Sequence, residues 1–186
     1  LIYLPHLDYC LQKFGQNFSL IKKDLGEVDH EVEKLVKYYQ SRNSKIILLS
    51  EYGITNVDRP VHLNRVLRNA GLLKVRIERG LELLDAGASD AFAVADHQVA
   101  HVYVNDQSKM ESVRDLLKAT AGIEWVFDRE QQKEHNIRHA RAGDFVAVAD
   151  DHSWFTYYFW LHDSKAPDYA RCVDIHKKPG YDPVEM

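Results

Sequence analysis

Acidic side chains follow two β-type segments in the first third of the chain. Asp8 comes shortly after the apolar run 1–4, and Glu51 comes directly after the apolar run 45–49, in the tetrapeptide Ser50-Glu51-Tyr52-Gly53. In open α/β sheets, ligands collect outside the carboxyl ends of the strands, so acids there are placed for chemistry. Lone acids at strand ends also serve as helix caps or stay solvated. Taken together, the two carboxylates predict a metal site at one edge of a sheet.

Histidines offer further ligands or bases. His176 lies in a polar segment before Pro179-Gly180, where it is either an exposed loop histidine or a third metal ligand. His97 and His101 are four residues apart in a β-type segment, which places them on one face of a strand. Asp96-His97 and Asp151-His152 are acid-imidazole pairs that could bind metal or act as a base. We expect structural or substrate-cap roles for His97 and His101.

Several function classes are excluded by missing motifs and by charge. The chain contains no Gly-x-Ser-x-Gly elbow, P-loop or dinucleotide fingerprint, and Cys10 lacks the pattern of a thiol nucleophile. A net charge of −4 and a pI near 6.2 give no general attraction to nucleic-acid polymers or to anionic membranes. With two cysteines and no signal-peptide pattern, the expected location is cytoplasmic, and the expected partner is a small molecule.

The elements that position these residues follow from hydrophobic spacing. Apolar residues three and four apart predict a helix over 19–42, and with strands at 1–4 and 45–49 it forms a βαβ unit beginning at Ile2. A short helix is expected over 60–71. The sequence then predicts strands at 73–78, 91–95, 99–104, 125–127 and 145–149, and a helix at 108–120. The aromatic run 154–160 is interpreted as a buried segment rather than a stacking platform, because no basic residues interleave with it.

The order of these residues resembles the C-terminal half of an alkaline-phosphatase-superfamily hydrolase of the type I phosphodiesterase and nucleotide pyrophosphatase branch. That family has an Asp after a strand and a His four residues on, then a strand ending in a Ser-Asp-His-Gly-like turn, an inserted region, and a single late His. The counterparts here are Asp8, Gln12, the 50–53 turn and His176.

The resemblance implies a fold class and a chemistry. It implies a partial alkaline-phosphatase-like α/β fold: a parallel-rich sheet flanked by helices, with an inserted α+β cap. The domain division is then 1–71 for the core, 72–144 for the cap and 145–186 for the return to the core. It implies two divalent ions, zinc or manganese, that help a Thr or Ser nucleophile to hydrolyse a small phosphate ester. The nucleophile is expected in an N-terminal half upstream, so the chain is expected to be a fragment, inactive alone.

Three departures from the family pattern leave alternatives open. Gln12 and Tyr52 stand where histidine ligands are expected, and Glu51 replaces Asp. The site of Asp8, Glu51 and His176 could hold a harder ion that favours oxygen ligands, or His6 could substitute for the missing imidazole. Alternatively, the protein is a non-catalytic binding or scaffold member that has lost its metal ligands. A third possibility is a small enzyme complete in itself, with His97 or His152 as the base.

Overall fold

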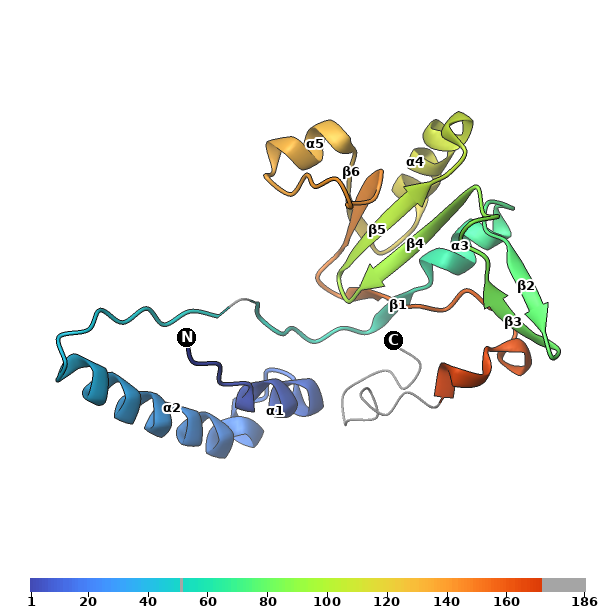
Figure 1. Cartoon of the computed structure of the whole chain (residues 1–186). Helices are drawn as coiled ribbons and strands as arrows, with labels where there is room; N and C mark the ends of the chain where they lie inside the picture. The colour runs from blue at the N-terminus through green and yellow to red at the C-terminus, as the bar shows by residue number, and fades with distance from the viewer. Residues whose placement is uncertain (51, 172–186) are drawn as a thin grey trace. The chain divides into compact units, whose positions relative to one another are not determined.

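The computed structural model describes residues 1–50 and 52–171. The chain is a mixed α/β protein, and it divides into two compact units, residues 1–56 and residues 57–171 of the described part (Figure 1). Among the described residues, no helix combines the length and apolar character needed to cross a bilayer.

The first unit is a pair of helices followed by an extended segment. Helix α1 covers His6–Phe14 and helix α2 covers Phe18–Gln40. Gly15 ends α1 with a φ of 57°, a left-handed conformation that glycine adopts at little cost, and the chain turns there into α2. Helix α2 confirms the helix expected from the spacing of apolar residues. Helix α1 was not expected from the sequence.

The two strands expected in this unit are not formed. Residues 1–5 and 44–50 are without regular secondary structure, and no strand among the described residues pairs with them. Ile47, Leu48 and Leu49 are 85%, 74% and 75% exposed. A strand needs a neighbour that accepts its backbone hydrogen bonds, and apolar composition alone does not supply one. The βαβ unit beginning at Ile2 is therefore wrong for the described structure.

The second unit is built on an antiparallel sheet of four strands in the order β4-β5-β7-β6. Its strands are β4 (Ala91–Asp96), β5 (Val99–Val104), β6 (Ile123–Phe127) and β7 (Phe145–Ala149). Alternate residues of β4 and β5 are buried, and they form one core with helices α3 (Leu63–Asn69) and α4 (Met110–Ala119). These strands and α4 confirm the elements expected between residues 91 and 149.

Smaller elements complete this unit. Strand β1 (Arg59–Val61) pairs in parallel with β8 (Ser153–Phe155), and β2 (Val75–Glu78) forms a hairpin with β3 (Leu81–Leu84). Helix α5 covers Arg129–Glu134. The 3₁₀ turns are η1 (Gln107–Lys109), η2 (Asp163–Lys165) and η3 (Asp168–Arg171).

Some expected boundaries in this unit were wrong, and some of its elements were missed. Pro60 lies in strand β1 rather than in the first turn of a helix, so the helix expected over 60–71 is shorter. Strand β3 and helix α5 were not expected, because their sequences lack a long periodic pattern.

The aromatic run 154–160 is largely core. Phe155, Phe159 and Trp160 are buried, which confirms the interpretation as a buried segment. Strand β7, which follows residue 144, pairs between β5 and β6. The division of the complete fold at residues 72 and 144 stays a prediction.

Candidate functional site

Two of the sequence motifs meet in the first unit. Asp8 lies in the first turn of α1, and Tyr52 lies in the extended segment 44 residues later. The Tyr52 hydroxyl donates a hydrogen bond of 2.8 Å to Asp8 Oδ1. The same segment is held at a second point, in the connection between α1 and α2, because Gln16 Nε2 donates to the Ile54 carbonyl at 2.7 Å. The turn after residues 45–49 is thus positioned over the helix that carries Asp8.

The side chains at this point are oxygen donors. Asp8 brings a carboxylate and Tyr52 a phenol, while Gln12 lies one helical turn beyond Asp8, on the same face of α1. Such a donor set suits a hard divalent ion such as magnesium or manganese better than it suits zinc, which prefers imidazole and thiolate ligands. The donor chemistry therefore fits a divalent ion. Glu51 and His176, the other two expected ligands, lie outside the described residues.

His6 lies with a different pair of acids. Its Nε2 atom is 3.0 Å from Glu27 and 3.4 Å from Asp24, both on α2. Residues two apart on a helix do not face each other, so His6 and Asp8 lie on different sides of α1. The ligand atoms of His6, Asp24 and Glu27 all lie within 4.8 Å of one another, which makes them a group that could hold a metal ion.

This second cluster was missed in the sequence. Asp24 and Glu27 are three apart on α2 and so share a face, but nothing in the sequence indicates that His6 packs against them. Protonated His6 also forms an ion pair with the two carboxylates without any metal, and at this exposure such a pair contributes little to stability.

The histidines of the second unit have structural contacts. His97 lies in the turn between β4 and β5 with a φ of 53°, and its carbonyl accepts a 2.7 Å hydrogen bond from the Phe155 amide. His101 lies in β5, where its Nδ1 accepts a 3.1 Å hydrogen bond from the Gly143 amide. The sequence placed both side chains on one face of a strand. That prediction is wrong, because His97 lies in a turn and only His101 lies in the strand. Their role as a substrate cap stays a prediction.

Comparisons with known proteins agree with the resemblance in the sequence. The family model "Type I phosphodiesterase / nucleotide pyrophosphatase" matches residues 1–182. No curated protein sequence matches the chain. Murine ectonucleotide pyrophosphatase / phosphodiesterase 5 is similar in structure, with a TM-score of 0.53 and 21% identity over 80% of this chain. An inactive variant of that protein in complex with AMP gives a TM-score of 0.54 and 22% identity, again over 80% of this chain.

The match covers only part of the known structures. This chain spans 36% of the murine protein, and phosphonoacetate hydrolase from Sinorhizobium meliloti matches over 53% of this chain and 24% of its own, with a TM-score of 0.40 and 17% identity. Because the family model extends over almost the whole sequence, the family is established from the chain itself. The chain belongs to the type I phosphodiesterase and nucleotide pyrophosphatase family.

Proposed function

We propose that this chain is the metal-binding C-terminal part of a hydrolase of phosphate esters, similar to phosphodiesterases and nucleotide pyrophosphatases. The nucleophile is contributed by an upstream N-terminal half. The observation that carries this proposal is the hydrogen bond between Tyr52 and Asp8, which brings together two family motifs that are 44 residues apart.

Each of the expected site residues has a role in the proposal. Asp8 and His176 hold one divalent ion, and Glu51 holds a second. The ions, manganese or, with the imidazole of His176, zinc, would help to activate the nucleophile and would neutralise charge on the phosphate ester. Tyr52 orients the Asp8 carboxylate through its hydrogen bond. A murine relative binds AMP, so we propose a nucleotide or a similar small phosphate ester as the substrate.

The exposed apolar segments of the first unit support an upstream half. Residues 45–49 have the composition of a buried strand, yet Ile47 is 85% exposed. Pairing with strands of an N-terminal half would bury these side chains and satisfy their backbone groups. We propose that residues 1–4 and 45–49 then form neighbouring strands of a parallel-rich sheet, with 72–144 as an inserted cap. A cytoplasmic location stays a prediction from the cysteine content.

One observation favours a non-catalytic alternative. The Tyr52 phenol stands where the family has an imidazole ligand, and it donates to the carboxylate that should bind the ion. In such a member the fold persists as a binding or scaffold protein. Metal analysis of the purified protein separates the two functions, because the scaffold alternative predicts no stoichiometric divalent ion.

A variant comparison tests the proposed hydrolase. In the protein expressed from its complete gene, Asp8→Asn should lower kcat/KM for an aryl phosphodiester by at least about 100-fold, because it removes a metal ligand. Asp29→Asn, an exposed acid of α2, is the matched control and should leave turnover unchanged. Equal activity of the two variants would contradict the role of Asp8.

A restoration experiment tests the alternative. Replacing Gln12 and Tyr52 together by histidine supplies the two imidazoles of the family pattern. If the wild-type protein lacks metal and activity while this double variant gains stoichiometric zinc, the protein is a scaffold that has lost its ligands. If the wild-type protein already holds metal and turns over substrate, the hydrolase proposal stands.

A further inference from the structure

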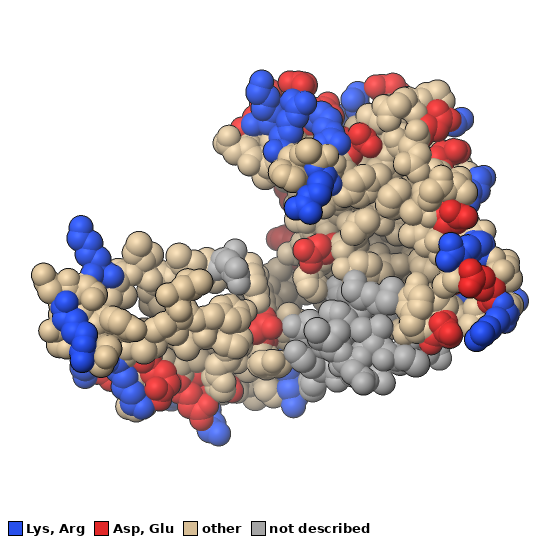
Figure 2. Space-filling view, in the orientation of Figure 1, with Lys and Arg blue, Asp and Glu red and all other residues tan. Residues whose placement is uncertain are grey.

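A strongly basic pocket lies beside helix α5, in the second unit. It is an open pocket of about 750 Å³, lined by Arg129, Lys133, Asn136, Arg138, His139 and Ala140. Three of these side chains are positively charged, and no carboxylate of the described residues lines the pocket. Figure 2 shows Lys and Arg side chains gathered over α5 and the segment that follows it. A concentration of positive charge in a concave site attracts anions.

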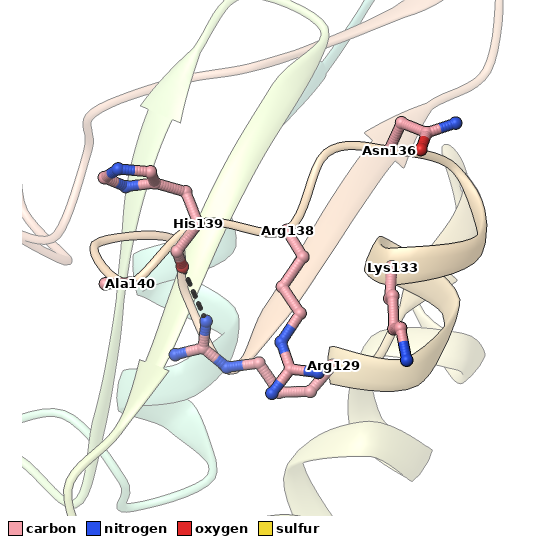
Figure 3. Close-up of a pocket in the computed structure, with 6 residues that line it drawn as sticks. All are labelled: Arg129, Lys133, Asn136, Arg138, His139 and Ala140. Atoms are coloured by element: carbon pink, nitrogen blue, oxygen red, sulfur yellow. Dashed lines mark hydrogen bonds between the residues drawn. The ribbon is translucent and has the colours of Figure 1, made fainter.

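The three cations line the same pocket. In Figure 3 the side chains of Lys133 and Arg138 extend in the same direction and that of Arg129 reaches toward the His139 carbonyl, whereas the His139 ring points away from all three. Among the described residues, Lys133 has no ion pair, and Arg138 has a 3.6 Å contact with exposed Glu130. Exposed pairs of this kind are weak, so both cations are available to a ligand.

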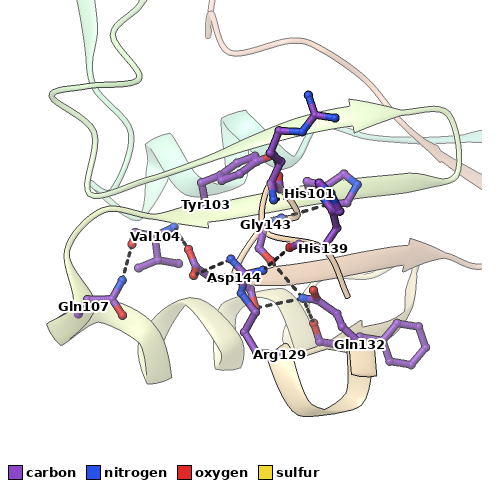
Figure 4. Close-up of polar contacts among 11 residues, drawn as sticks. His101, Tyr103, Val104, Gln107, Arg129, Gln132, His139, Gly143 and Asp144 are labelled. Atoms are coloured by element: carbon purple, nitrogen blue, oxygen red, sulfur yellow. Dashed lines mark hydrogen bonds and ion pairs between the residues drawn. The ribbon is translucent and has the colours of Figure 1, made fainter. Parts of the chain in front are cut away.

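Arg129 is held in place by the fold. Its guanidinium donates to the His139 carbonyl at 3.1 Å and lies 3.6 Å from Asp144, whose other carboxylate oxygen accepts the Val104 amide at 2.8 Å (Figure 4). These contacts engage both terminal nitrogens, Nη1 and Nη2, of the guanidinium, which has five N–H donors in all. An ordered arginine binds phosphate oxygens with less loss of side-chain entropy than a mobile one.

Helix α5, which carries Arg129 and Lys133, is also held in place by the fold. Helix α5 begins with a capping box, in which the Asp128 side chain accepts from the Gln131 amide and Gln131 reaches back to the Asp128 amide. Gln132 is fully buried, and its Nε2 donates a hydrogen bond of 3.1 Å to the Gly143 carbonyl (Figure 4). The helix that carries Arg129 and Lys133 is therefore fixed to the segment that leads into strand β7.

The charge and size of the pocket select the ligand. Three clustered cations, of which Arg129 also faces Asp144, favour a ligand with more than one negative charge, and the volume lies within the range of about 300–1,000 Å³ of small-molecule sites. A nucleic-acid polymer is disfavoured, because the chain as a whole carries a net charge of −4. We propose that Arg129, Lys133 and Arg138 form a binding site for the oligophosphate group of a small molecule, such as pyrophosphate or a nucleoside diphosphate. This site does not depend on the metal chemistry proposed above.

Calorimetric titration of metal-stripped protein with inorganic pyrophosphate, in metal-free buffer, tests the site apart from any hydrolysis. We expect saturable binding of one pyrophosphate per chain. Lys133→Gln and Arg138→Gln should each weaken it about tenfold, the loss of one charge-assisted contact. Lys118→Gln, an exposed lysine of α4 in the same unit, is the charge-matched control and should change the affinity less than about twofold.

Two further arms define the ligand. Titration with ADP shows whether the site binds the oligophosphate group of a nucleotide as well as free pyrophosphate. Binding of either ligand supports the proposal if Lys133→Gln weakens it. Sulfate should bind much more weakly than pyrophosphate, because it cannot bridge all three cations. The proposal is overturned if pyrophosphate gives no saturable binding, if sulfate binds equally well, or if Lys118→Gln weakens binding as much as Lys133→Gln.

Discussion

Asn64 hydrogen-bonds the backbone of the edge strand of the main sheet, and its replacement should destabilise the second unit. The residue is on α3 and is 4% exposed. Its Nδ2 donates to the Ala93 carbonyl and its Oδ1 accepts from the Ala93 amide, both at 2.8 Å. Strand β4, which carries Ala93, is an edge strand in the described part of the chain, so no other strand there pairs with these backbone groups on that side. Asn64 thus acts as a one-residue substitute for a neighbouring strand.

Asn64→Leu keeps the size of the side chain but removes both hydrogen bonds. Leaving two buried backbone groups unpaired costs about 1–3 kcal/mol each. The more apolar side chain offsets about 1–2 kcal/mol, so we expect a net loss of about 3 kcal/mol. With a urea m-value of about 1.5 kcal/mol/M, the unfolding midpoint should fall by about 2 M.

Tryptophan fluorescence is a suitable assay, because all three tryptophans of the chain lie in the second unit. Asn69→Leu, at the exposed end of the same helix, is the matched control and should shift the free energy of unfolding by less than about 0.5 kcal/mol. If Asn64→Leu unfolds at the same urea concentration as Asn69→Leu, the edge contact does not stabilise the sheet and the reasoning is wrong.

Two further predictions concern the same unit. Gly143→Ala should cost about 3 kcal/mol or more, because its Cβ would lie 2.6 Å from the Val102 amide nitrogen. Gly87→Ala, whose Cβ would make only an ordinary 3.9 Å contact with Asp85 Oδ1, should cost less than about 1 kcal/mol in urea unfolding. The hydrogen bonds from the Arg68 guanidinium lower the pKa of Glu82 from its usual 4.5. The stability that this carboxylate contributes is therefore full above the unfolded pKa of about 4.5 and is lost as the pH falls through the lower folded value. At pH 7 the free energy of unfolding of Glu82→Gln should be about 2 kcal/mol lower than that of wild type. This difference should disappear below the folded pKa of Glu82. A difference that does not change with pH would contradict the contribution of the Glu82 carboxylate.

Elements held by local periodicity could be predicted from the sequence. Helix α2 and strands β4 to β7 follow from spacings of three and four or of two residues, and they formed where expected. Helix α5 was missed because its stability comes from the capping box at Asp128 and from buried Gln132, and a glutamine looks like a surface residue in a sequence.

The candidate site depended more on non-local contacts. The family pattern pointed to Asp8 and Tyr52, and the structure brings them into a hydrogen bond. The strand expected at 45–49 did not form, because strand pairing requires a partner and the described residues contain none for it. The cluster of His6 with Asp24 and Glu27 could not be foreseen, since it requires the angle between two helices.

The requirement for a divalent ion is the claim on which the proposed function depends most. The direct measurement is turnover of an aryl phosphodiester by the protein from its complete gene, after the metal is stripped and then after manganese or zinc is added back. We predict that stripping abolishes turnover and that one of the two ions restores it in wild type but not in Asp8→Asn. Turnover that survives stripping, or recovery that is as complete in Asp8→Asn as in wild type, would contradict a metal site at Asp8.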